Sequence, residues 1–199
     1  AISAADNAAG AAVVINDITN TFHSKIDSST ITAGTIKSDA QAASFLVTAA
    51  GGAAVSTKNG AGGGSVVWNG ISNDVKAGAL NSTLTAKTIN AKALNGIRMI
   101  SVAGQIAAGK GSAVGLALSV NDILTNTLAY AYATTLHGDD TADSELLIEA
   151  ENNSDVLDIS ASIAASEKLS IGGSVAINKL TNNTKALVDN TYTDDLGVV

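Results

Sequence analysis

Residues 172–190 read Gly-Gly-Ser-Val-Ala-Ile-Asn-Lys-Leu-Thr-Asn-Asn-Thr-Lys-Ala-Leu-Val-Asp-Asn, and the central part of this stretch occurs three more times in the chain. Each copy is centred on one key asparagine. The four key asparagines are Asn16, Asn69, Asn121 and Asn178, which are 53, 52 and 57 residues apart. Self-similarity at a nearly fixed period is the sequence signature of a repeat architecture.

The residues around the key asparagines keep the same types in every copy. The position immediately before them is always apolar: Ile15, Trp68, Val120 and Ile177. Apolar residues also stand three positions before and two positions after, and alternation of this kind is typical of strands. We expect the column of Ile15, Trp68, Val120 and Ile177 to fill the core, so that Ile177→Asp would be strongly destabilising. In the third copy Leu124 reads as an insertion, which would move the second conserved asparagine position to Asn126.

Composition supports strands and turns throughout the 199 residues. Val, Ile, Thr and Ser dominate the apolar runs, while Asn and Gly interrupt them every few residues. Proline is absent, as expected where every strand is central in a parallel sheet. We therefore predict an all-β fold, a parallel β-helix (β-solenoid) in which each repeat of about 53 residues forms two coils of short strands. We expect the whole chain, 1–199, to form one such segment with four partial copies of the repeat.

This architecture makes a specific prediction about the key asparagines. Asn16, Asn69, Asn121 and Asn178 should lie in one column, in every second coil, and their amides should cap bends or bond neighbouring coils. Neither end of the chain offers a polar or helical cap, and we expect it to be a segment of a longer β-helix.

The stretch 172–190 resembles the repeat of leukotoxin-family filamentous adhesins, large bacterial surface exoproteins similar to filamentous haemagglutinins. The resemblance covers essentially the whole chain, since all four copies match. It implies a right-handed parallel β-helix, secretion by a type V route (autotransporter or two-partner secretion), a location at the bacterial cell surface, and a role in adhesion or virulence or as a stalk. The expected partners are a receptor or glycan on a host or neighbouring cell, together with end-to-end self-association.

Charge and composition exclude several other classes. The formal charge is −7 with a single arginine, Arg98, so nucleic acid is not an expected partner. The longest apolar stretch, 99–120, contains Lys110, and no transmembrane segment is predicted. Cysteine is absent, which excludes disulfides and cysteine-ligated metals. We expect no cofactor and no catalysis.

The densest polar cluster is the acidic loop at 137–145, within the longest repeat. Its candidate ligand residues are His137, Asp139, Asp140 and Asp143. Oxygen ligands at short spacing could hold calcium, although the loop lacks the EF-hand spacing, and a solvated acidic turn is the simpler interpretation.

One functional alternative is a polysaccharide-active enzyme, because such enzymes also use parallel β-helices. A deep cleft with paired acids near Asp139 or Asp155 would favour it. Asp155 and Asp158 are three residues apart and should point to opposite sides of a strand. A weaker option, ice binding, would need a flat array of threonines along one face. The stretches 30–32 and 83–85 carry such threonines, but the other two copies do not continue the pattern.

Overall fold

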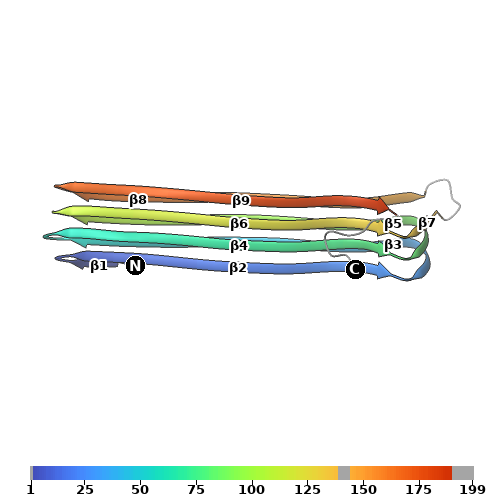
Figure 1. Ribbon diagram of the computed structural model, residues 1–199. Coiled ribbons are helices and arrows are strands. Elements are labelled where there is room, and N and C mark those ends of the chain that lie inside the picture. The colour runs from blue at the N-terminus through green and yellow to red at the C-terminus, as the bar shows by residue number, and fades with distance from the viewer. Residues whose placement is uncertain (1, 139–143, 190–199) are drawn as a thin grey trace.

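The computed structural model describes residues 2–138 and 144–189, which form strands and tight turns and contain no helix. Figure 1 shows the strands lying nearly parallel in stacked layers. The strands are β1 (Ile2–Ala5), β2 (Ala8–Asp27), β3 (Thr30–Ser56), β4 (Gly60–Leu80), β5 (Thr83–Gly109), β6 (Ser112–Tyr132), β7 (Thr135–His137), β8 (Glu145–Ser166) and β9 (Leu169–Asp189).

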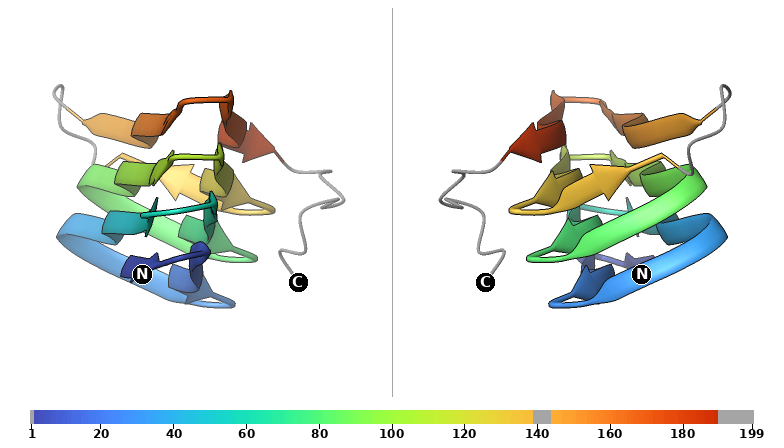
Figure 2. Two further views of the ribbon diagram at one scale, coloured as in Figure 1. Left: turned by 90° about the vertical axis from the view of Figure 1, so that its left-hand side faces the viewer. Right: turned by 90° about the vertical axis from the view of Figure 1, so that its right-hand side faces the viewer.

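The strands form two parallel sheets that face each other, seen from their ends in Figure 2. One sheet has the order β1-β3-β5 followed by β7 and β8, which both pair with β5. The other has the order β2-β4-β6-β9. The chain runs along one sheet, turns, and returns along the other. This is a parallel β-solenoid, and the predicted fold class is confirmed.

The prediction of two coils per repeat is wrong, because each repeat forms a single coil. Asn16 lies directly beside Asn69 in the next strand, Asn69 beside Asn121, and Asn121 beside Asn178. The seven long strands have 20 to 27 residues, or roughly 70–90 Å at the usual rise. The asparagines and glycines that we interpreted as corners lie inside these strands. Coils are consequently flat, with only two turns each.

The turns that join β2 to β3, β4 to β5 and β6 to β7 are stacked copies of one another. Their first residues, Ser28, Asn81 and Ala133, have φ of 48°, 49° and 45°. The backbone N–H groups of Ser28 and Asn81 donate to Leu80 and Tyr132 in the next coil, at 3.0 and 3.1 Å. Hydrogen bonding between coils therefore continues through the turns.

The register explains the unequal repeat lengths. The turn 110–111 is one residue shorter than the turn 57–59. Seven residues, 138–144, lie between His137 and Glu145, whereas only Ala86 and Lys87 lie between their partners Thr85 and Thr88. The long repeat thus gains its extra residues within the acidic loop, as its length suggested.

Leu124 is not an insertion, contrary to the prediction. It pairs in unbroken register with Ser72 on one side and Thr181 on the other. Thr125, not Asn126, occupies the second asparagine position. Its hydroxyl donates to Asn182 Oδ1 at 2.9 Å, so a hydroxyl replaces the amide in this copy.

The core lies between the sheets and is thin, because many of its buried side chains are alanines. Buried alanines pack against one another near the turn at 57–59, including Ala54, Ala61, Ala107 and Ala113. Larger side chains gather around the middle of the strands, where Ile71, Ile97, Met99 and Ile123 form one cluster. Others gather toward the turn at 81–82, where two clusters include Ile36, Leu84, Ile89, Leu80, Leu128 and Tyr130.

The predicted orientation of the strands that carry the key asparagines is wrong. The asparagines point between the sheets, and the preceding apolar residues point outward. Ile15, Trp68 and Ile177 are 68%, 36% and 50% exposed, and Val120 is half-buried. Amides that bond one another from coil to coil lose little on burial, and they are small enough for the sheets to approach. A tryptophan in this narrow space would hold the sheets apart.

Candidate functional site

The key asparagines form one continuous hydrogen-bonded ladder, which we call the first ladder. The Nδ2 of Asn16 donates to Asn69 Oδ1 at 2.9 Å, Asn69 to Asn121 at 2.8 Å, and Asn121 to Asn178 at 2.7 Å. Asn69 and Asn121 are completely buried. The predicted column and the bonds between neighbouring coils are confirmed, but the column includes every coil. Asparagine stacking of this kind strengthens cross-β structures.

A second ladder runs beside the first and consists of Asn20, Asn73, Thr125 and Asn182. The Nδ2 of Asn20 donates to Asn73 Oδ1 at 3.0 Å. Asn73 also donates across to the facing sheet, to Asn95 Oδ1 at 2.7 Å. The ladders thus connect neighbouring coils within one sheet, and their hydrogen bonds to the facing sheet connect the two sheets.

Polar residues of the facing sheet complete the first ladder, and our sequence reasoning missed them. Thr48 donates to Asn69 Oδ1 at 3.0 Å, and Ser101 accepts from Asn69 at 3.4 Å. Asp158 accepts from Asn121 Nδ2 at 2.9 Å. Thr48, Ser101 and Asp158 share one column, so the spacing of these polar residues was the available signal.

The ladder residues form a structural site and offer no substrate access, because Asn69, Asn73, Ser101 and Asn121 are all buried. The accessible side chains lie on the outer faces, and two hollows there lie over glycines.

The first outer hollow lies over Gly70, at the middle of β4, and has a volume of about 330 Å³. Asp17 and Asp122 flank Gly70 on the neighbouring strands β2 and β6. The Trp68 ring leans over Gly70, so that a Cβ placed there would lie 3.1 Å from Trp68 Cη2 and 3.0 Å from Asp17 Oδ1. Lys179 forms an ion pair with Asp122 at 3.2 Å. We call this the Trp68 hollow.

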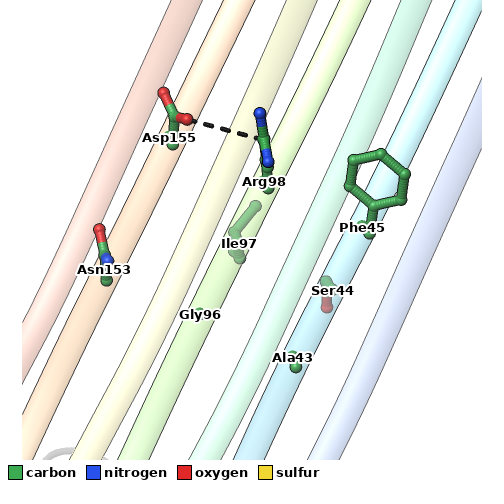
Figure 3. A pocket seen from close by; sticks show the side chains of 8 residues that line it. All are labelled: Ala43, Ser44, Phe45, Gly96, Ile97, Arg98, Asn153 and Asp155. Atoms are coloured by element: carbon green, nitrogen blue, oxygen red, sulfur yellow. Dashed lines mark ion pairs between the residues drawn. The ribbon is translucent and has the colours of Figure 1, made fainter.

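The second outer hollow lies over Gly96 on the other sheet, with a volume of about 420 Å³ (Figure 3). Phe45, Arg98 and Asp155 form the column beside it. Arg98 Nε lies 3.9 Å from Asp155 Oδ2, and both side chains are well exposed. Asp155 points outward and Asp158 inward, as their spacing predicted. The hollow is open, and Asp155 is the one acid that lines it among the described residues.

Exposed ion pairs continue along both outer faces. The Glu149 carboxylate beside Lys92, 2.9 Å away, raises the pKa of that ammonium group. At the end of β2, hydrogen bonds from Lys25 and Ser28 lower the pKa of Asp27. These groups lie in water, so they contribute little to stability.

The predicted acidic loop lies largely outside the described residues, because Asp139, Asp140 and Asp143 are among those not described. His137 ends β7 and pairs with Thr85. Within the described ranges, no three His, Asp or Glu side chains gather closely enough to hold a metal ion. No helix that could span a membrane is found among residues 2–138 and 144–189.

Comparison with protein-family models, curated proteins and solved structures returns no match.

Proposed function

We propose that the chain is a structural and adhesive segment of a secreted bacterial cell-surface adhesin, in which the solenoid displays glycan-binding hollows and performs no catalysis. The sequence resemblance to filamentous adhesins supports the surface location. The observation that carries the binding role is the Trp68 hollow. It combines an outward tryptophan ring with carboxylates on both sides of a bare glycine.

These groups suit the chemistry of a sugar. Carboxylates accept hydrogen bonds from hydroxyl groups, and an aromatic ring offers a flat apolar surface to the C–H face of a pyranose. Gly70 provides the space, because a side chain there would meet Trp68 and Asp17. Ser72 and Thr181 add hydroxyls at the edge of the hollow.

A polysaccharide-active enzyme is the second candidate, and one observation favours it. Asp17 and Asp122 lie two strand spacings apart, or about 10 Å between Cα atoms. Inverting glycosidases hold their two carboxyl groups roughly 6.5–9.5 Å apart. Against this role, Asp122 is engaged by Lys179, and the hollow lies on an open face.

A glycan array followed by calorimetry would test the proposal. Trp68→Ala should weaken binding of a captured glycan about tenfold or more, since tryptophans that a ligand covers often contribute most of the binding free energy. Ile106→Ala removes an exposed apolar side chain from the opposite sheet and is the matched control. Absence of any glycan ligand, or equal loss in both variants, would contradict the binding role.

An assay for new reducing ends separates the two candidates. Release of products that stops in Asp17→Asn and Asp122→Asn would establish the enzyme. Binding without release supports the adhesive segment.

A further inference from the structure

The two ends of the stack carry nearly the same sequence. β2 is the last strand of its sheet at one end and β9 at the other (Figure 1). If the register of the stack continued by one more coil, β9 would meet β2 with its key asparagine opposite Asn16. The following residues would then stand opposite residues of the same or similar type: Gly172 and Gly10, Val175 and Val13, Ile177 and Ile15, Asn178 and Asn16, Leu180 and Ile18, Thr181 and Thr19, Asn182 and Asn20, Val188 and Ile26.

Both ladders also have a direction, and it is the same in each. The hydrogen bonds within each ladder run from the β2 side toward β9, with the Nδ2 or hydroxyl as donor. The β9 end therefore presents the Nδ2 donors of Asn178 and Asn182. The β2 end presents the Oδ1 acceptors of Asn16 and Asn20. Donors at one end match acceptors at the other.

The two ends would bring together one opposite-charge pair and two like-charge pairs. In this register Lys179 of β9 would lie opposite Asp17 of β2, which has no ion-pair partner among the described residues. Two like-charge pairs would also form, because Glu149 of β8 would meet Asp39 of β3 and Asp189 of β9 would meet Asp27 of β2. Asp27 already has Lys25 as a counterion at 2.9 Å, and exposed like charges are screened by salt. The Lys179–Asp17 pair would form in the same register that aligns the asparagine ladders.

One element stands in the way of a complete junction. β1 pairs with Ala53–Ser56 of β3, and so covers the last four positions of an edge that has no other strand partner among the described residues. Backbone bonds from Thr57 and Asn59 to Ala5 and Asp6 hold it there. The end of β8 would need this same edge.

We propose that a second copy of this chain docks head to tail, with its β2 and β3 edges on β9 and β8. The junction extends both sheets by parallel pairing, continues both asparagine ladders, pairs Lys179 with Asp17 and displaces β1. This inference rests on the end strands alone. Asp17 and Lys179 also line the Trp68 hollow, so self-association is measured without any glycan and its outcome does not depend on glycan binding.

Two blocked variants test the direction of docking. Asn178→Asp with Asn182→Asp keeps the oxygens that accept from Asn121 and Thr125, but turns the outward donors into acceptors. Asp17→Lys places an ammonium opposite Lys179. Sedimentation of the wild type at rising concentration should show dimers and longer chains, and each variant alone should associate at least tenfold more weakly. An equimolar mixture should form dimers and nothing longer, because one intact end of each kind remains.

Asn183→Asp is the control for the chemical change, because it places one Asn→Asp substitution on the outward face of β9, outside the ladders. It should associate as the wild type does. Removal of residues 1–6 should strengthen association by freeing the β3 edge. A wild type that stays monomeric at millimolar concentration overturns the proposal, as does a blocked variant that dimerises alone or a mixture that does not.

Discussion

At the scale of single residues, the buried asparagines are the most consequential feature of the fold. Asn69 makes bonds to both neighbouring coils and to Thr48 and Ser101 of the facing sheet. A buried polar group without a partner costs about 1–3 kcal/mol, while a partnered one is nearly neutral. Removing one member of the ladder therefore leaves several others unsatisfied.

Asn69→Leu should consequently lower the free energy of unfolding by about 2–4 kcal/mol, through the unpaired amides of Asn16 and Asn121. Asn16→Leu, in the end coil, leaves only one neighbour unpaired and should cost about 1 kcal/mol. Urea denaturation measures both. Equal effects would show that the ladder does not couple the coils.

The orientation of the strands gives a second prediction at this scale. Ile177 is half exposed, so Ile177→Asp should cost less than about 1 kcal/mol, contrary to the expectation from the sequence. Ile71 is almost fully buried, and Ile71→Asp should cost several kcal/mol because it buries an unpaired carboxylate. The melting temperatures of both variants test this prediction. A larger loss of stability in Ile177→Asp than in Ile71→Asp would show that Ile177 points into the core, as the sequence suggested.

At the scale of elements, the turns are the strained parts. Ser28, Asn81 and Ala133 occupy the same position in three stacked turns, all with positive φ. Asparagine tolerates this region because its short polar side chain bonds locally, whereas alanine pays a steric penalty of roughly 1 kcal/mol.

Ala133→Gly should therefore stabilise the protein by about 0.5–1 kcal/mol, by relieving the contact between Cβ and the backbone. Asn81→Gly at the equivalent position should change stability much less. The shift in urea midpoint measures both. A destabilised Ala133→Gly variant would show that the unfolded-state entropy of glycine outweighs the strain.

The sequence predicted the strand class, parallel stacking and the asparagine column, because a repeated pattern demands equivalent positions. It did not predict the number of coils. Gly70 and Asn69 look like corner residues in the sequence. In the structure, Gly70 lies on the outer face beneath Trp68, and the Asn69 side chain points inward as part of the first ladder. The Trp68 hollow was missed for the same reason. Trp68 shares a column with Ile15 and Ile177, and apolar identity alone cannot tell which face of a two-layer stack is covered.

At the scale of the whole molecule, each coil contacts only its neighbours, so stability should grow with the number of coils. Residues 60–111 make one full coil, and Gly60 and Ser112 share a column. A second copy of 60–111 inserted after Gly111 would continue both sheets and both ladders in register. This insertion should raise the urea midpoint. It should also steepen the dependence of the unfolding free energy on urea concentration, since more surface is buried in one cooperative unit. A second copy of 60–82 alone adds one strand without the strand that runs back along the facing sheet. Every later strand would then fall in the wrong sheet, and this variant should not fold cooperatively. If the full-coil variant is less stable than the wild type, the nearest-neighbour description of this solenoid is wrong.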